Sequence, residues 1–168
     1  KSLDPADASA VSRIHFTVER RKVHSIESFA SLPGPLHDAA AGFIADLEAL
    51  VAAPEATHSG TDDTVYVRNP AIAGPMSAFG YAYLSDKYGE QNEAALRLLQ
   101  YSGARGSSGE YAYEALNLVD GKRTVSEIRN WLTAELGPVP QEIVREYLEA
   151  LRSIDVIRLP SVAAESKQ

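Results

Sequence analysis

The sequence contains no cysteine among its 168 residues. This absence excludes disulfide bonds, thiolate metal sites and cysteine nucleophiles, and it leaves the redox compartment open. The sequence also has no long apolar run. The longest, residues 39–45, ends at Asp46, whereas a helix that spans a membrane needs about 18 apolar residues.

Positive charge is also scarce. With 16 basic against 23 acidic side chains the net charge is −7, so phosphate backbones and anionic lipids are repelled on average. An initiator methionine and a basic-then-apolar leader are missing as well. We therefore expect Lys1 to begin a processed product or a piece of a longer chain.

The rest of the composition is typical of a folded protein. Apolar residues make up 45% of the chain and charged residues 23%, and the length suffices for one compact domain or two small ones. Apolar residues recur mostly at helical spacing. The predicted fold class is mainly α, with a helical bundle-like N-terminal part followed by a small helix-turn-helix or winged-helix-like C-terminal part.

Residues 1–53 predict an N-terminal helical segment. A first helix is expected to begin at Asp4-Pro5, where aspartate caps and proline fits the first helical position, and to end before Pro33. A second is expected to begin at Gly34-Pro35. Its apolar residues predict a narrow seam that packs on a neighbouring helix: Leu36, Ala40, Phe43, Leu47 and Leu50.

Residues 54–102 predict a middle segment. Residues 54–63 are polar and are the best hinge candidate, and residues 64–67 predict a short, isolated strand. Residues 76–88 and 91–101 predict two further helices, the first with aromatic packing from Phe79, Tyr81 and Tyr83. The glycines that follow predict a flexible link between two parts of the chain: Gly103, Gly106 and Gly109.

Residues 110–160 predict a winged-helix-like domain, followed by a flexible tail at 161–168. One helix is expected to end at an Asp120-Gly121 turn, and Thr124 with Glu127 predicts a capping box at the start of the next. A third helix and a β-like run over 154–159 follow. The region carries nine acidic and six basic residues, which disfavours DNA binding.

No catalytic, cofactor-binding or metal-binding residue is predicted. His15 and Glu19 lie one helical turn apart, but zinc needs three or four ligands, so a partly buried, hydrogen-bonded histidine is expected. His58 lies near Asp62 and Asp63 in the sequence. A solvated loop is a simpler interpretation of these residues than a catalytic triad.

The middle of the sequence is rich in tyrosine. Packing in a helical core is the default interpretation, and the alternative is a surface for a protein partner, since tyrosine offers a large contact area at low entropic cost. The candidate partner surface consists of Tyr81, Tyr83, Tyr88, Tyr101, Tyr111 and Tyr113.

Two segments resemble parts of the di-zinc exopeptidases of the aminopeptidase and glutamate carboxypeptidase type. Residues 2–11, beginning Ser2-Leu3-Asp4-Pro5, resemble the stretch after the last zinc-binding histidine, and residues 111–159 are similar to C-terminal extensions of large bacterial members. The resemblance implies an α/β zinc hydrolase parent that removes terminal amino acids, with its metal ligands and glutamate base upstream of Lys1. It also implies an extracytoplasmic location, periplasmic or secreted.

The segment from Asp120-Gly121 through Thr124-Val125 to Glu127-Ile128 also resembles the small winged-helix modules that bind leader peptides, related to the pyrroloquinoline-quinone peptide chaperone. Such modules pair a peptide with the edge of a sheet. We expect no hairpin strands ahead of Tyr111 to supply that edge.

These observations lead to three hypotheses. The first is a non-catalytic accessory or scaffold subunit without a cofactor, which acts through contacts with a larger protein partner or its own parent polypeptide, with no nucleic acid and no transmembrane segment. The alternatives are a fragment of a zinc aminopeptidase whose catalytic residues lie upstream, and a peptide-binding winged-helix module.

Overall fold

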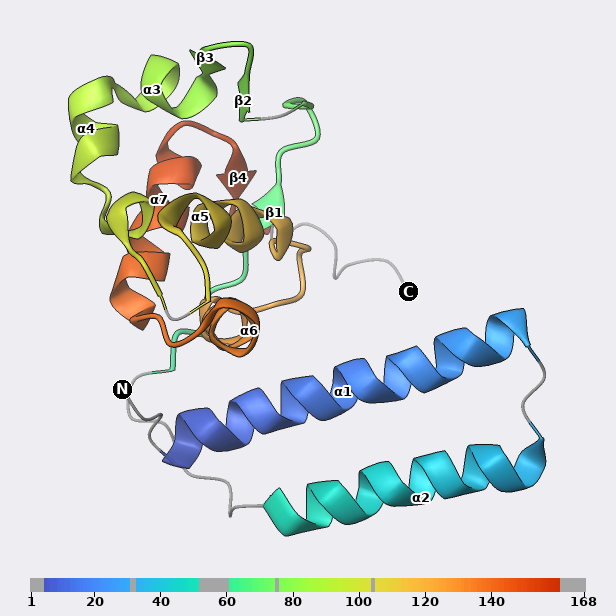
Figure 1. Cartoon of the computed structure of the whole chain (residues 1–168). Coiled ribbons are helices and arrows are strands. Elements are labelled where there is room, and N and C mark those ends of the chain that lie inside the picture. The colour runs from blue at the N-terminus through green and yellow to red at the C-terminus, as the bar shows by residue number, and fades with distance from the viewer. Residues whose placement is uncertain (1–4, 31–32, 52–60, 75, 104, 161–168) are drawn as a thin grey trace, which may run out of the picture. The chain divides into compact units, whose positions relative to one another are not determined.

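The computed structural model describes residues 5–30, 33–51, 61–74, 76–103 and 105–160. The chain divides into two compact units, residues 1–60 and 61–168, and this division falls within the predicted hinge (Figure 1). Helices dominate both units, which confirms the mainly α fold class. None of the helices in the described ranges combines the length and the apolar character that crossing a bilayer requires.

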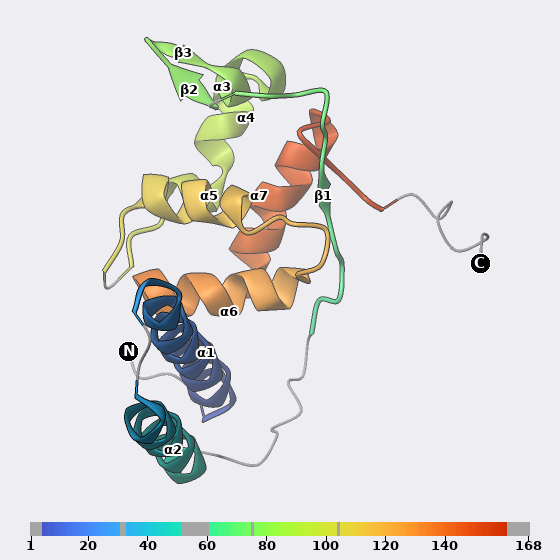
Figure 2. The ribbon, with the colours of Figure 1, turned by 90° about the vertical axis from the view of Figure 1, so that its right-hand side faces the viewer.

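The first unit is a pair of helices, α1 (Pro5–Phe29) and α2 (Gly34–Val51), which lie side by side (Figure 2). Both confirm the prediction, although Asp4, the expected cap of α1, lies outside the described residues. Arg20 of α1 forms an ion pair with Glu48 of α2.

The predicted apolar seam of α2 divides into two stripes. Ile44 is buried and Ala40 and Leu47 are half-buried on one side of the helix. Leu36, Phe43 and Leu50 are exposed. Because residues seven positions apart stay on one side of a helix, these three exposed side chains form a continuous line. Of the five residues of the predicted seam, only Ala40 and Leu47 therefore contribute to burial, together with Ile44, which the prediction did not include.

The second unit contains the remaining elements. A two-residue strand, β1 (Val67–Arg68), is followed by β2 (Ser77–Ala78), β3 (Tyr81–Ala82), α3 (Tyr83–Tyr88), α4 (Glu90–Ala95) and the 3-10 helix η1 (Arg97–Gln100). The last elements are α5 (Ser108–Asn117), α6 (Val125–Leu136), α7 (Gln141–Ser153) and β4 (Ile157–Arg158).

One apolar core joins the described part of the predicted middle segment, residues 61–102, to the predicted domain at 110–160. Leu84 of α3 and Leu98 of η1 are buried in the same cluster as side chains of α5, α6 and α7. The expected flexible link packs closely, since a Cβ added at Gly103 would lie 1.8 Å from the Tyr111 hydroxyl oxygen. Glycine is needed here for a close approach, and the structure places no division between units at residues 103–109.

The helix predicted over residues 76–88 is wrong in its first half. There β2 and β3 form an antiparallel hairpin, with Ala78 opposite Tyr81. The two loop residues, Phe79 and Gly80, have φ of +51° and +84°. Positive φ at both loop positions is what a type I′ turn requires, and no helix can continue through it. The expectation of no hairpin ahead of Tyr111 is therefore also wrong.

The helix predicted over residues 91–101 divides in a similar way. Leu96 adopts an extended conformation, with φ of −70° and ψ of 112°, between α4 and η1. Its side chain is buried at 3% exposure, so tertiary packing stabilises the break.

The two β-like runs predicted at 64–67 and 154–159 pair with each other. β1 and β4 are antiparallel, with Val67 opposite Arg158, and Val65 forms an isolated bridge to Thr124. The strand expected to be isolated therefore lies between two partners. Between these contacts Tyr66 is buried, and its hydroxyl donates to the carboxylate of Glu149 in α7.

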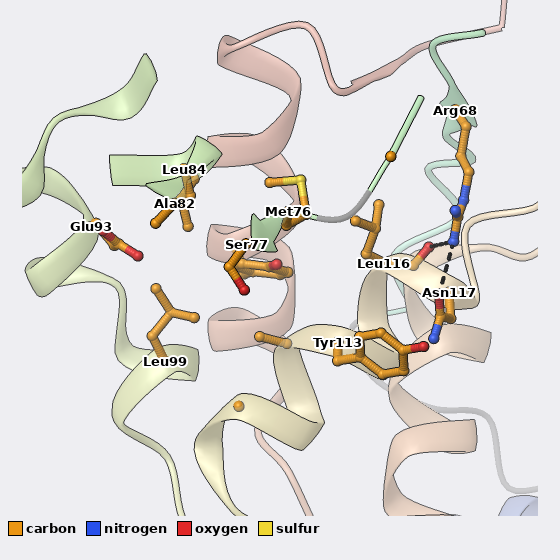
Figure 3. Close-up of a pocket in the computed structure, with 14 residues that line it drawn as sticks. Arg68, Met76, Ser77, Ala82, Leu84, Glu93, Leu99, Tyr113, Leu116 and Asn117 are labelled. Atoms are coloured by element: carbon orange, nitrogen blue, oxygen red, sulfur yellow. Dashed lines mark hydrogen bonds between the residues drawn. The ribbon is translucent and has the colours of Figure 1, made fainter. Parts of the chain in front are cut away.

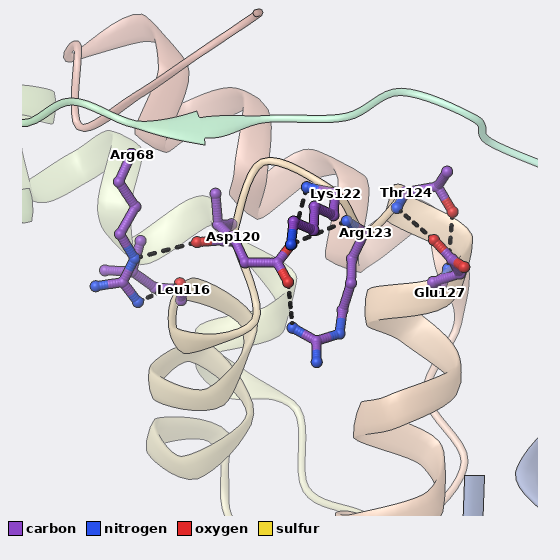
Figure 4. A network of polar contacts seen from close by, with 8 residues as sticks. Arg68, Leu116, Asp120, Lys122, Arg123, Thr124 and Glu127 are labelled. Carbon is purple, nitrogen blue, oxygen red and sulfur yellow. Dashed lines mark hydrogen bonds and ion pairs between the residues drawn. The ribbon is translucent and has the colours of Figure 1, made fainter. Parts of the chain in front are cut away.

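Polar contacts fix the turn between α5 and α6 (Figure 4). Asp120 Oδ1 accepts hydrogen bonds of 2.9 Å from the backbone N–H groups of residues 122–123, and Gly121 has a φ of +80°. The capping box is confirmed as well. The Glu127 N–H donates to the Thr124 hydroxyl over 3.1 Å, and the Thr124 N–H donates to the Glu127 carboxylate over 2.8 Å.

Candidate binding pocket

A pocket of about 530 Å³ lies in the second unit, between α5, α7 and the segment that runs from β2 to η1 (Figure 3). Its size falls in the range of pockets that hold a small molecule or one or two side chains. The side chains that matter for its chemistry are Arg68, Met76, Leu84, Glu93, Tyr113 and Tyr147.

Small residues leave the space open. Ala82 of β3, Ala112 of α5 and Gly109 in the first turn of α5 all line the pocket. A Cβ added at Gly109 would meet no heavy atom within 4 Å. Because Met76, Leu84 and Leu99 form apolar walls around this space, the pocket suits an apolar stem.

Tyr147 brings a polar atom to these walls. The residue belongs to α7 and is only 4% exposed, and no hydrogen bond joins its hydroxyl to another described residue. Burial, and then the nearby Glu93 carboxylate, raise the pKa of Tyr147 to about 12. The phenol therefore stays protonated at neutral pH. The residue is buried as a whole, but its hydroxyl oxygen keeps accessible surface, because Thr133 Oγ1 is the one fully buried side-chain polar atom without a partner among the described residues. The Tyr147 hydroxyl can therefore donate to or accept from a molecule bound in the pocket.

Glu93 of α4 provides a half-buried carboxylate in the pocket wall. It accepts a hydrogen bond from the hydroxyl of Ser85. Among the described residues no lysine or arginine forms an ion pair with it. Glu146, by contrast, is paired with Arg97 at 2.6 Å. The negative charge of Glu93 is therefore not compensated by an ion pair with any residue that the structure describes.

Arg68 lies on the opposite side of the pocket from Glu93 (Figure 3). Its guanidinium donates to the Leu116 carbonyl over 2.6 Å and to the Val119 carbonyl over 3.3 Å. These carbonyls belong to the C-terminal end of α5, where a cation is favourable. Arg68 thus has a structural role that fixes β1 against α5.

Exposed aromatic side chains lie around the pocket. Tyr113 of α5 lines it and is 68% exposed. The hairpin that contributes Ser77 and Ala82 to the pocket carries Phe79, which is fully exposed, at its tip. Positive φ is unfavourable for phenylalanine by about 1–2 kcal/mol. Phe79 thus combines an exposed ring with an unfavourable backbone conformation. Residues with such a conformation are often found at functional sites.

The predicted tyrosine surface is only partly a surface. Tyr81 and Tyr113 are exposed, whereas Tyr83, Tyr88 and Tyr101 are half-buried against the core. Tyr111 is fully buried, and its hydroxyl donates to the carbonyls of residues 136 and 137. Burial, and then Tyr101, raise the pKa of Tyr111 to about 12.

Sequence reasoning missed Tyr147 and Glu93. In the sequence, Tyr147 stands among the apolar residues of its helix, and Glu93 is one of 23 acidic residues, so neither is distinguished by a pattern. The available signal was a hydroxyl at a core position of α7, where a polar atom needs a partner.

The histidines do not assemble a site. His15 is exposed rather than partly buried, and Glu19 pairs with Lys22 at 2.6 Å. His24 and His37 both contact Glu27. His58 lies outside the described residues. In the part of the chain that the structure describes, no group of three or more histidine, aspartate or glutamate side chains could hold a metal ion.

Asp62 is buried and has a structural role. Its carboxylate accepts from the Thr64 N–H over 3.1 Å and pairs with Arg145 of α7 at 2.5 Å. Burial on its own would raise the pKa of Asp62, but these hydrogen bonds and the arginine charge outweigh it and lower the pKa.

Compared with protein-family models, curated proteins and solved structures, this chain matches none of them. The pocket is therefore the feature of the chain that bears on its function.

Proposed function

We propose that this chain is a non-catalytic accessory module that binds a segment of another polypeptide in the pocket between α5, α7 and the β2–β3 hairpin. The observation that carries the proposal is a pocket with apolar walls that is also lined by Tyr147, whose hydroxyl makes no hydrogen bond to a described residue. Exposed Phe79 and Tyr113 extend the contact area, and aromatic side chains of this kind are enriched at protein interfaces.

The first unit supports an accessory role with a second exposed apolar surface. Leu36, Phe43 and Leu50 lie along one side of α2 and are 55%, 64% and 83% exposed. Regularly spaced exposed apolar side chains on a helix are typical of a contact with another protein.

The exopeptidase hypothesis remains a prediction, as does the extracytoplasmic location that it implies. The peptide-binding hypothesis agrees with the proposal in the class of ligand but differs in the place. The proposed contact is the pocket, rather than the free edge of a sheet.

The test is a titration of the full chain with three acetylated and amidated pentapeptides, Ala-Leu-X-Leu-Ala, in which X is lysine, norleucine or glutamate. At least one peptide should shift amide resonances of Met76, Tyr113 and Leu116. Gly109→Leu should abolish these shifts by filling the pocket, because Gly109 lines it and a Cβ added there meets no heavy atom within 4 Å. Urea unfolding checks that this variant is as stable as the parent. Absence of shifts with all three peptides would contradict the proposal.

A further inference from the structure

We infer that the pocket selects a basic side chain, lysine or arginine, from the bound polypeptide, and this inference rests on the function proposed above. The juxtaposition that carries it is that the carboxylate of Glu93 and the Tyr147 side chain, whose hydroxyl makes no hydrogen bond to a described residue, line one pocket together with apolar side chains.

The charge of Glu93 favours a basic ligand. Glu93 is half-buried, and no basic side chain of the described residues neutralises it. A carboxylate that is partly removed from water gains most from a cation that enters the same site, because the interaction is screened less than at the open surface. A ligand with an ammonium or guanidinium group supplies that cation.

The walls of the pocket also suit a basic side chain. The walls of the pocket include Met76, Leu84 and Leu99, which are apolar. Lysine and arginine have an apolar stem with a charged end, so they can cover such walls while the charge reaches a polar partner. The apolar stem of the ligand then contacts the apolar walls, and its charged end interacts with the polar side chains of the pocket.

Hydrogen bonding favours a basic ligand as well. The Tyr147 hydroxyl stays protonated at neutral pH and has lone pairs that can accept from an ammonium group, while the carboxylate of Glu93 accepts further hydrogen bonds. Arg68 would repel the cation, but it lies on the opposite side of the pocket, where carbonyls of α5 hold its guanidinium (Figure 3). The two charges therefore favour one orientation of the ligand.

The net charge of the second unit also favours a basic ligand. Residues 61–160 contain 14 acidic and 10 basic side chains. A net negative unit attracts basic segments and accelerates their association, with an effect that falls as salt is added.

The three pentapeptides test this inference separately from the proposed function. The full chain should bind the lysine peptide about tenfold more tightly than the norleucine peptide, and the glutamate peptide most weakly. Glu93→Gln retains an acceptor for Ser85 but removes the charge, so it should bind the lysine and norleucine peptides equally. Glu90→Gln is the matched control, because Glu90 is exposed on the same helix and does not line the pocket.

The outcomes are distinguishable. If the norleucine or glutamate peptide binds as tightly as the lysine peptide, the inference is overturned and the proposed function stands. A lysine preference that persists in Glu93→Gln also overturns it. If no peptide binds, the proposed function fails and the inference fails with it.

Discussion

Gly103 lies so close to the side chain of Tyr111 that there is no room for a Cβ at this position. A Cβ at this position would lie 1.8 Å from the Tyr111 hydroxyl oxygen and 2.6 Å from the ring. The ring has no room to move, because Tyr111 is fully buried and its hydroxyl lies 2.7 Å from the Leu136 carbonyl.

We therefore expect Gly103→Ala to lower the free energy of unfolding by about 3 kcal/mol, through overpacking and a lost hydrogen bond. Gly109→Ala is the control. Its Cβ meets nothing within 4 Å, and alanine in a helix should stabilise by up to about 1 kcal/mol. Urea unfolding measures both, and equal stability of the two variants would contradict the packing argument.

Asp62 gives the second unit a dependence on pH. Its pKa is lowered in the folded protein, because hydrogen bonds from Thr64 and the pair with Arg145 outweigh the effect of burial. A carboxyl with a lowered folded pKa stabilises the fold above its unfolded pKa of about 3.9, and this contribution is lost as the pH falls through the lower folded pKa.

Asp62→Asn should therefore cost about 1 kcal/mol at pH 7, a modest value because the Arg145 side chain is 52% exposed. The cost should shrink below about pH 4, as the parent Asp62 becomes protonated. Asp63→Asn, at an exposed neighbour, should change stability by less than about 0.5 kcal/mol. Urea titrations at several pH values provide the measurement. A cost that does not change with pH would show that the charge of Asp62 is unimportant.

At the scale of elements, the β2–β3 hairpin places a strained residue at an exposed position. Asparagine before glycine is the preferred pair for a two-residue loop with positive φ at both positions, and Phe79 stands where asparagine would be favoured.

Phe79→Asn should therefore raise the free energy of unfolding by about 1 kcal/mol, since no packing is lost and the strain is relieved. The same change should weaken pentapeptide binding if the ring contacts the ligand. Phe79→Leu removes the ring and keeps the strain, so it should weaken binding without a gain in stability. Urea unfolding and the amide-shift titration report the two effects. Unchanged binding in both variants would remove Phe79 from the proposed surface.

The elements that sequence predicts well are those whose signals are local. The capping box of Thr124 and Glu127 and the Asp120-Gly121 turn depend on neighbouring residues, and both are present. The hairpin could not be predicted, because Phe79 has no preference for positive φ and adopts it only in the folded unit. Leu96 breaks a helical pattern for a similar reason, since its burial outweighs its helix propensity.

The pocket was beyond prediction for a different reason. Glu93 and Tyr147 are 54 positions apart, and the packing of α3 and η1, which flank α4, against α7 brings them to one pocket. No periodicity or spacing encodes that contact. Whether a basic side chain pairs with Glu93 is likewise a property of the folded unit, because it depends on the positions of the lysine and arginine side chains around Glu93.

At the scale of the whole molecule, the two units differ in how much apolar surface they bury. The second has a core that includes Leu98, Tyr111, Ile128, Leu148 and Ile157, all fully buried. In the described part of the first, the buried apolar residues are Ala10, Val11 and Ile44. Apolar burial is the main favourable term in folding, so the second unit should carry most of the stability.

Separate expression of residues 61–168 and 1–60 tests this difference. The 61–168 fragment should unfold in one cooperative urea transition, with a midpoint close to that of the full chain, because the described core of this unit consists of residues between 66 and 157. The 1–60 fragment should show weak helicity at low concentration, since two helices with so small a buried surface are marginal in water. Its helicity should rise with concentration as the exposed line of Leu36, Phe43 and Leu50 becomes covered by association. Circular dichroism and size-exclusion chromatography measure these effects. A cooperatively folded, monomeric 1–60 fragment would show that α1 and α2 need no partner, and it would remove the support that this surface gives to an accessory role.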